Sequence, residues 1–218
     1  MKTIEEIWSI VNGLKELYPD GVCSLDYRKD YELLFSVRLA AQCTDERVNK
    51  VTPALYARFP TLEALAEADI AEVERYIHST GFFRAKAKDI VLASQMLLRD
   101  YGGRVPDTME ELLKLPGVGR KTANLILGDV YHVPGVVVAD THCIRITGRL
   151  GITDGSKDPV QVERQLRQSI PPKESSDFCH RMVLFGRDTC TARSPKCEGC
   201  PLAGDCDSAR AAAKAAKK

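Results

Sequence analysis

The sequence predicts an all-α protein, and three observations support that prediction. Apolar residues recur at helical spacing along most of the chain. The first segment shows this on one face, with Ile4, Ile7, Val11 and Leu14. Alternation of apolar and polar residues, which is typical of half-buried strands, is almost absent, and glycines such as Gly81 separate the helical segments.

Composition is that of a soluble globular protein. The 218 residues are 44% hydrophobic and 28% charged, which suffices for one large domain or two small ones and argues against disorder. No stretch approaches the ~18 to 20 apolar residues of a membrane-spanning helix, and acids stand where a signal peptide would be apolar. We therefore expect a cytoplasmic protein without membrane partners. A net charge of +1 does not exclude nucleic-acid binding, which needs only a basic face.

The helices can be placed in order along the chain. Thr3 and Glu6 have capping-box spacing, which predicts the start of the first helix. Later helices are predicted at 31–42, 45–58, 62–67, 70–79, 84–99, 109–114, 120–130, 141–150, 160–169 and 178–187. Two segments stay open: 136–138 reads as a short strand or a buried connection, and 209–218 as a frayed helix or a disordered basic tail.

A tight turn with the sequence LPGVGRKTA joins two predicted helices at 115–123. Gly117 and Gly119 let the backbone turn sharply and expose N-H groups at the start of the next helix, where the helix dipole favours an anion. A DNA phosphate is the natural ligand. The alternative is a plain helix-turn-helix connection whose glycines serve geometry alone.

The segment VVVADTHCIR at 136–145 places Asp140 at the predicted start of a helix. Aspartate is a preferred N-cap, and the positive end of the helix dipole suits a carboxylate that accepts a proton or stabilises a developing cation. The two roles are compatible. His142 is either a polar packing residue or a contact to a ligand.

Four of the eight cysteines are clustered, which indicates a metal site and not a disulfide framework. They are Cys190, Cys197, Cys200 and Cys206. Their spacing fits neither the paired units of common zinc sites nor the tight ferredoxin run, so spacing alone leaves zinc and iron-sulfur open. The scattered cysteines are predicted to be buried small apolar residues: Cys23, Cys43, Cys143 and Cys179.

These three motifs together resemble the endonuclease III family of helix-hairpin-helix DNA glycosylases. The turn at 115–123 resembles the family's phosphate-binding hairpin, 136–145 resembles the stretch with its essential aspartate, and C-x6-C-x2-C-x5-C resembles its 4Fe-4S cluster loop. They occur in the expected order along almost the whole chain. The resemblance implies a bifunctional base-excision repair enzyme that removes oxidised pyrimidines from damaged double-stranded DNA and cleaves the abasic site by β-elimination.

The resemblance also implies a two-domain architecture. A six-helix domain is expected at 23–134, with the helix-hairpin-helix at about 108–130. A second domain is expected from 1–22 plus 135–218, with the cluster loop at 190–206. The DNA-binding cleft would lie between the domains. We expect the chain to act as a monomer, associated with the nucleoid when it is bound to DNA.

The resemblance assigns the catalytic pair. Lys121, which on an ordinary helix would be a solvated charge, becomes the nucleophile that forms a Schiff base, and Asp140 becomes its partner. The hairpin residues Gly117, Val118, Gly119 and Arg120 are expected to hold a DNA phosphate.

Local basic excess predicts further backbone contacts near the cluster loop. Arg181, Arg187, Arg193 and Lys196 face the single acid Asp188 in this part of the sequence. Such a density of cations suits phosphate, although any one of them is equally a solvated surface charge.

Two residues are expected to fill the space left by an extruded base. In the family the segment matching 41–45 supplies a glutamine plug, here Gln42, and the turn matching 80–83 supplies an apolar wedge, here Phe82. The wedge is more familiar as leucine, and Ala40 stands where some relatives carry a serine. Both departures bear on lesion preference or on the handling of the opposite strand, and Gln42 or Phe82 has packing as its alternative role.

Relatives and other classes offer competing interpretations. A mismatch adenine glycosylase shares the hairpin and cluster but lacks the lysine and usually has a further domain. A monofunctional thymine-mismatch glycosylase is disfavoured by the same lysine. A non-catalytic DNA-binding module or an iron-sulfur redox sensor is disfavoured because both Lys121 and Asp140 are present.

Overall fold

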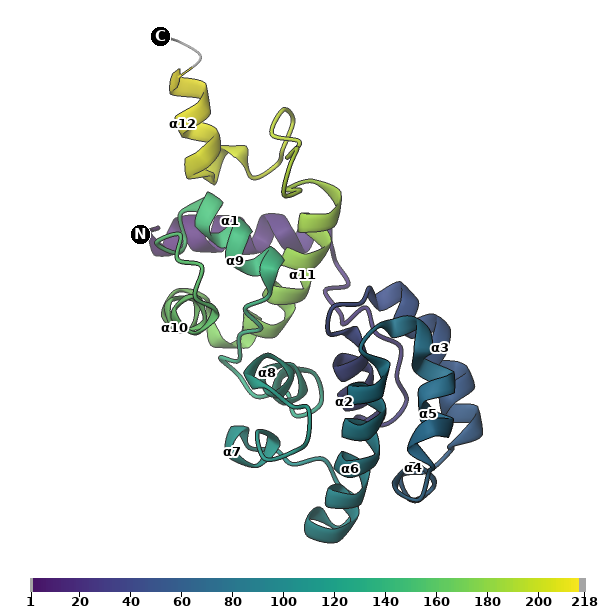
Figure 1. Cartoon of the computed structure of the whole chain (residues 1–218). Helices are drawn as coiled ribbons and strands as arrows, with labels where there is room; N and C mark the ends of the chain where they lie inside the picture. The colour runs from purple at the N-terminus through teal and green to yellow at the C-terminus, as the bar shows by residue number, and fades with distance from the viewer. Residues whose placement is uncertain (1, 216–218) are drawn as a thin grey trace. The chain divides into compact units, whose positions relative to one another are not determined.

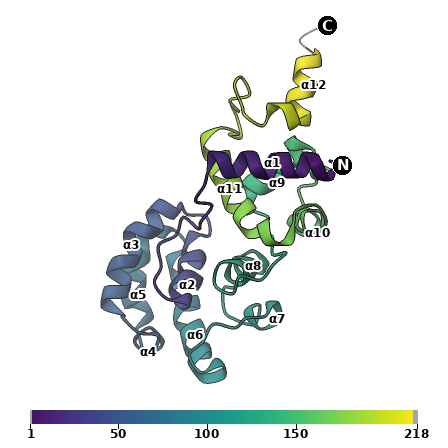
Figure 2. The same cartoon turned by 180° about the vertical axis from the view of Figure 1, so that it is seen from behind.

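Helices make up all the regular structure in residues 2–215, the part of the chain that the computed structural model describes (Figure 1 and Figure 2). This range contains twelve α-helices and three short 3-10 helices, and no strand. The all-α prediction is confirmed. No helix within the described range is long and apolar enough to cross a membrane.

The chain divides into two compact units. Cys23–Tyr131 forms the first, which we call the inserted unit. Met1–Val22 and His132–Lys218 together form the second, which we call the terminal unit because it contains both ends of the chain.

The inserted unit is built around α2 and α6. Its helices are α2 (Asp30–Ala40), α3 (Asp45–Arg58), α4 (Leu62–Ala66), α5 (Ile70–Ile77), the 3-10 helix η1 (His78–Thr80), α6 (Phe83–Tyr101), α7 (Met109–Leu112) and α8 (Arg120–Asp129). The long helix α6 packs against α4 and α5, and α2 packs against α3, α6 and α8. Because α2 is covered on several sides, Leu33, Leu34 and Phe35 are all buried in succession.

Side-chain caps explain where several of these helices begin. Thr44 accepts a hydrogen bond from the Arg47 amide at the start of α3, and Thr108 accepts one from the Glu111 amide at the start of α7. Gly119, which precedes α8, has no side chain to do the same. The first-turn N-H groups of α8 are therefore not used by an N-cap side chain.

The terminal unit packs α11 against both α1 and α9. Its helices are α1 (Ile4–Leu17), α9 (Thr141–Leu150), α10 (Pro159–Ser169), η2 (Pro172–Glu174), α11 (Ser175–Asp188), η3 (Ala203–Asp205) and α12 (Asp207–Ala215). The predicted capping box of Thr3 and Glu6 is present at α1. The described part of the C-terminal segment is helical, in α12, and 216–218 lie outside the described residues.

Two open or incorrect expectations are resolved here. Residues 136–138 form no strand, and their side chains are buried, so they are the buried connection into α9. Cys143 and Cys179 are buried as predicted, but Cys23 and Cys43 are only half-buried, and that part of the prediction is wrong. Both of these cysteines lie in or beside loops, where less of the surrounding chain covers them.

Candidate active site and metal centre

The hairpin turn packs against an ion pair in the inserted unit. Gly117 has φ +74°, and the Val118 amide donates to the Leu115 carbonyl at 3.1 Å to close the turn. A Cβ at Gly117 would lie 2.6 Å from both Arg38 Nε and Asp89 Oδ2. These two side chains are paired at 2.8 Å, so the turn needs glycine for its backbone angle and for its close approach to the pair.

The start of α8 is presented to solvent. Gly117, Gly119, Arg120 and Lys121 are exposed, and Val118 is half-buried. Lys121 lies in the first turn of α8, directly after this turn. The arrangement combines helix N-H groups that no side chain caps, an exposed guanidinium and an exposed amine in one short segment, which can bind an anion and carry a nucleophile.

Asp140 caps α9 in the terminal unit. Its Oδ1 accepts a hydrogen bond from the Cys143 amide at 2.7 Å, and its backbone carbonyl accepts one from the Ile144 amide. The predicted N-cap role is therefore observed. The carboxylate is half-buried and is held at the positive end of the helix.

His142 packs against α11. Its Nδ1 lies 3.2 Å from Arg145 Nη2, and a Cβ at Gly186 would come within 2.3 Å of the same nitrogen. His142 packs closely against Gly186, so it has the predicted role of a polar packing residue. A contact from His142 to DNA remains a prediction.

Gln42 and Phe82 share an unusual backbone conformation. Both have positive φ, +55° and +47°, although neither is glycine, and both are exposed. Phe82 leaves 69% of its surface exposed, which is rare for a large apolar side chain in a strained position. Strained and exposed residues of this kind gather at functional sites.

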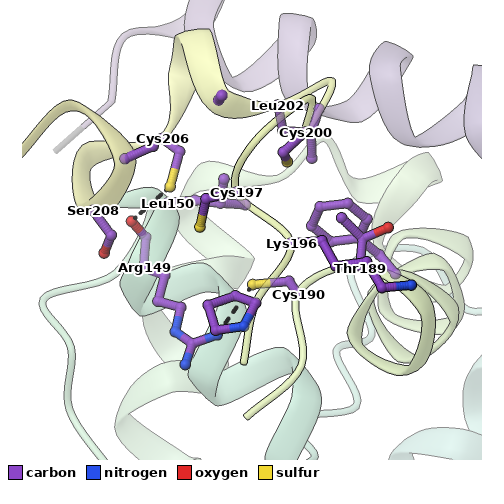
Figure 3. A pocket seen from close by; sticks show the side chains of 14 residues that line it. Arg149, Leu150, Thr189, Cys190, Lys196, Cys197, Cys200, Leu202, Cys206 and Ser208 are labelled. Carbon is purple, nitrogen blue, oxygen red and sulfur yellow. Dashed lines mark hydrogen bonds between the residues drawn. The ribbon is translucent and has the colours of Figure 1, made fainter. Parts of the chain in front are cut away.

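The four clustered cysteines line one pocket in the terminal unit (Figure 3). The pocket holds about 120 Å³, several times the volume of a water molecule, and Leu150, Phe185 and Leu202 form part of its apolar wall. Burial raises the pKa of the Cys200 thiol, and the nearby sulfurs of Cys190, Cys206 and Cys197 raise it further. The four thiols therefore share one apolar pocket.

This donor set fits an iron-sulfur cluster. Four cysteine thiols line the pocket, with no histidine or carboxylate among the described residues that line it, and iron-sulfur clusters are held by cysteine thiolates. An apolar pocket lined by four cysteines suits such a cluster.

Two arginines that the sequence did not single out hold the cluster loop. Arg149 donates to Cys190 Sγ at 3.3 Å, to the Thr191 carbonyl at 2.7 Å and to the Ala192 carbonyl at 2.9 Å. Arg145 donates to the Cys190 carbonyl at 3.0 Å. They are spaced by one helical turn on α9, Arg145 as the last residue of the Asp140 motif and Arg149 after it, and this spacing is the signal that would have found them.

Arg181 corrects the prediction of basic DNA contacts. It is only 5% exposed, and its guanidinium donates to the carbonyls of Tyr18 (2.9 Å) and Pro19 (3.2 Å). Arg181 therefore ties the segment after α1 to α11 and is not available to phosphate. Arg187, Arg193 and Lys196 are exposed, as a backbone contact requires.

The predicted site residues are divided between the units. The inserted unit contains Gln42, Phe82, Lys121 and the hairpin residues 117–120. The terminal unit contains the cluster cysteines together with Asp140, His142, Arg187, Arg193 and Lys196. The structure brings the four cysteines together, and it places Lys121 and Asp140 in different units.

Comparison with protein families matches two parts of the chain. Residues 35–172 match the HhH-GPD superfamily of base excision DNA repair proteins. Residues 190–206, which contain the four cysteines, match the iron-sulfur binding domain of endonuclease III. The first match covers more than half of the chain.

Individual relatives agree over nearly the full length. Endonuclease III of Synechocystis sp. is 50% identical over 91% of this chain and 90% of its own length. Endonuclease III of Bacillus subtilis is 39% identical over 94% of each chain.

Solved structures give the same result. The structure of a trapped endonuclease III-DNA covalent intermediate superposes with a TM-score of 0.90 at 39% identity, covering 98% of this chain and all of that one. A thermostable thymine-DNA glycosylase, at 20% identity and a TM-score of 0.84, shares the fold, with 95% of this chain and 98% of that one covered. The chain thus belongs to the endonuclease III family of HhH-GPD base-excision DNA repair enzymes that carry a 4Fe-4S cluster.

Proposed function

We propose that this protein is a bifunctional DNA glycosylase and AP lyase that removes oxidised pyrimidines from duplex DNA as a monomer. The observation that carries the proposal is the exposed Lys121 in the first turn of α8, beside the hairpin. A structural relative at 39% identity has been trapped as a covalent intermediate with DNA, which requires a protein nucleophile. Lys121 is our candidate for that nucleophile here.

The first chemical step replaces the base by the lysine. The neutral amine of Lys121 attacks C1′ of the damaged nucleotide, and the C1′-N bond breaks with its electron pair leaving on the base. One proton passes from the lysine nitrogen to the departing base and a second to O4′ as the sugar ring opens, which leaves an imine between Lys121 and C1′. Asp140, in the terminal unit, stabilises the cationic character that develops or accepts a proton.

The second step cleaves the strand. The imine acidifies the C2′ proton, and its removal expels the 3′ oxygen with its phosphate by β-elimination. Water then hydrolyses the imine and returns Lys121 as a free amine. All bonds are formed and broken on the substrate, Lys121 and one water molecule, so no external oxidant or reductant is consumed.

Access to C1′ requires that the nucleotide leave the base stack, at a cost of a few kcal/mol. We assign to Gln42 and Phe82 the role of filling the space that the extruded nucleotide leaves in the base stack, since their strained backbones hold both side chains in solvent. Gly117, Val118, Gly119 and Arg120 would hold one phosphate through helix N-H groups. Arg187, Arg193, Lys196 and His142 would contact the duplex from the terminal unit.

The cluster is assigned a structural role. Cys190, Cys197, Cys200 and Cys206 would bind it. The cluster would then fix a loop that otherwise depends on Arg145, Arg149 and a few backbone hydrogen bonds. Arg193 and Lys196 lie in that loop. The cluster thereby orders the loop whose cations contact DNA.

Borohydride trapping tests the proposal. The protein is incubated with a duplex that contains thymine glycol, with and without borohydride, beside a Lys121→Gln variant and a Lys88→Gln control at another exposed lysine. We expect a covalent complex and a nicked strand from the native protein and the control, and neither from Lys121→Gln. A trapped complex with Lys121→Gln would contradict the proposal, base release without trapping would indicate a monofunctional glycosylase, and binding without reaction a non-catalytic module.

A further inference from the structure

Lys86 in α6 is completely buried, with 0% of its surface exposed. Lysine is almost never fully buried, because an ammonium group loses its hydration there unless protein atoms replace it. A charge buried to this extent needs hydrogen-bond partners. Neither the hairpin nor the catalytic pair accounts for it.

The ammonium of Lys86 joins two segments that are far apart in sequence. Its Nζ donates to the Leu39 carbonyl at 2.8 Å and to the Thr80 carbonyl at 2.8 Å. Leu39 lies in the last turn of α2, and Thr80 ends η1. The two carbonyl oxygens therefore lie close together, because both accept a hydrogen bond from the same nitrogen.

Each of these carbonyls stands shortly before a strained and exposed residue. Leu39 precedes Gln42 by three positions, and Thr80 precedes Phe82 by two. The backbone amide of Lys86 also donates to the Phe82 carbonyl at 3.1 Å. A non-glycine residue keeps a positive φ only where its surroundings enforce it, and Lys86 contacts the backbone on which both residues depend.

The remaining surroundings act on the charge of Lys86 in opposing directions, so the two carbonyl acceptors are what favour the ammonium form. The end of α2 carries the negative pole of its helix dipole, which favours the ammonium. Burial lowers the pKa of Lys86, the Cys43 thiol raises it, and Arg38 lowers it. Because the amine is fully enclosed and directed at two carbonyls, Lys86 has no access to a reacting atom of DNA.

We propose that Lys86 is a positioning residue. Its buried ammonium holds together the two backbone segments that lead to Gln42 and Phe82, and it thereby controls extrusion of the damaged nucleotide. The inference rests on the roles proposed above for Gln42 and Phe82. Its consequence is specific: loss of the clamp impairs opening of the stack and leaves the lysine chemistry at Lys121 intact.

The experiment compares Lys86→Met, Lys86→Arg and a control, Lys88→Met, which removes an exposed lysine two residues along the same helix. Unstacking is read from 2-aminopurine fluorescence beside a tetrahydrofuran abasic analogue in a duplex. Chemistry is read from single-turnover excision of thymine glycol in a duplex, and from borohydride trapping on an abasic site in a single strand, where no stack has to be opened.

We expect Lys86→Met to lose most of the fluorescence change and to slow duplex excision by about tenfold or more, because hydrogen bonds from a charged donor are lost. Single-strand trapping should stay within about twofold of the native rate, since the chemistry is unaffected. Lys86→Arg retains a cation with donors and should recover part of the duplex rate. Lys88→Met should match the native protein.

A double-mutant cycle separates positioning from general stabilisation. In a Gln42→Ala, Phe82→Ala background, Lys86→Met should slow duplex excision by no more than about a further twofold, because the side chains it positions are already gone. An undiminished loss in that background would overturn the inference, as would an equal loss in single-strand trapping.

Folding is checked by circular dichroism, and Lys86→Gln replaces Lys86→Met if the latter does not fold. If neither variant folds, Lys86 serves the stability of the inserted unit and the inference is wrong. If the native protein neither unstacks nor cleaves the duplex, the proposed function fails. If the native protein is active and Lys86→Met equals it, only this inference fails.

Discussion

At Asp140 the structural role and the proposed chemical role can be separated by replacing the carboxylate with an amide. Its Oδ1 accepts a hydrogen bond from the Cys143 amide and caps α9, and asparagine caps a helix as well as aspartate does. We expect Asp140→Asn to keep the free energy of unfolding within about 0.5 kcal/mol and to slow base excision strongly. Asp140→Ala should slow excision and also cost about 1 kcal/mol, because the cap is lost.

Urea unfolding and single-turnover excision measure the two quantities on the same samples. If Asp140→Asn excises at the native rate, the carboxylate charge has no part in the reaction. If Asp140→Ala unfolds at the native urea concentration, the cap contributes nothing.

At Phe82 the backbone conformation that lowers the stability of the fold also presents the side chain proposed to act on DNA. At φ +47° a side chain costs roughly 1 kcal/mol relative to glycine, and little is recovered by burial because the ring is 69% exposed. Phe82→Gly should therefore leave the free energy of unfolding unchanged or raise it by up to about 1 kcal/mol, while duplex excision falls.

Phe82→Leu is the matched control, since it keeps an apolar side chain and the backbone strain. It should excise at close to the native rate with native stability. Excision by Phe82→Gly at the native rate would show that the ring is dispensable and that the strain has another origin.

The sequence predicts site residues whose signal is local, and it gives no sign of a residue whose proposed role depends on distant partners. Lys121, Asp140 and the cysteines stand in short motifs that can be read in order along the chain. Lys86 stands in an ordinary amphipathic pattern, and its partners Leu39 and Thr80 come from other elements. No local pattern marks the burial of that charge.

At the scale of elements, the hairpin turn depends on two glycines for different reasons. Gly117 has a positive φ and lies against the Arg38–Asp89 pair, whereas Gly119 has φ −105°, and a Cβ added there would meet no atom within 4 Å. Gly117→Ala should cost about 1 to 3 kcal/mol, since it adds backbone strain and displaces the ion pair. Gly119→Ala should cost less than about 1 kcal/mol, because alanine is only a poorer N-cap.

Thermal unfolding and DNA affinity distinguish the two glycines. Both variants should bind duplex DNA more weakly, but only Gly117→Ala should lower the melting temperature by several degrees. Equal melting temperatures would show that the turn accommodates a side chain at 117.

Helix ends were predictable where a cap fixed them and not where the tertiary structure did. The predicted helix at 45–58 coincides with α3, which begins after the Thr44 cap. The predicted helix at 31–42 ran two residues too far, because the chain leaves α2 at Ala40 to reach the positive φ of Gln42. The helix predicted from 178 begins at Ser175, whose buried hydroxyl donates to the Pro172 carbonyl.

At the scale of the whole molecule, the chain builds one unit from both of its ends and inserts the other between them. Helical periodicity predicts the helices but contains no information on which of them share a core. The resemblance placed the division after 134, and the contacts divide the chain after Tyr131. All four cluster cysteines belong to the terminal unit, so all ligands of the cluster come from that unit.

This division predicts a local response to removal of iron. Metal binding energy is folding energy for the segment that holds the ligands. We expect chelation to raise deuterium uptake in 189–215, and in the last turn of α9, where Arg149 bonds the loop, because the loop loses its fixed points. Helices α2 to α8 contain no cluster ligand and should keep their native uptake.

Hydrogen-exchange mass spectrometry measures each segment, and the visible absorbance of the cluster reports the extent of iron loss. Cys200→Ser should reproduce the effect of chelation, whereas Cys23→Ser, a half-buried cysteine of the inserted unit, should leave both uptake and absorbance native. Increased uptake throughout 23–131 would show instead that the cluster stabilises the whole chain, and a structural role confined to the cluster loop would then be wrong.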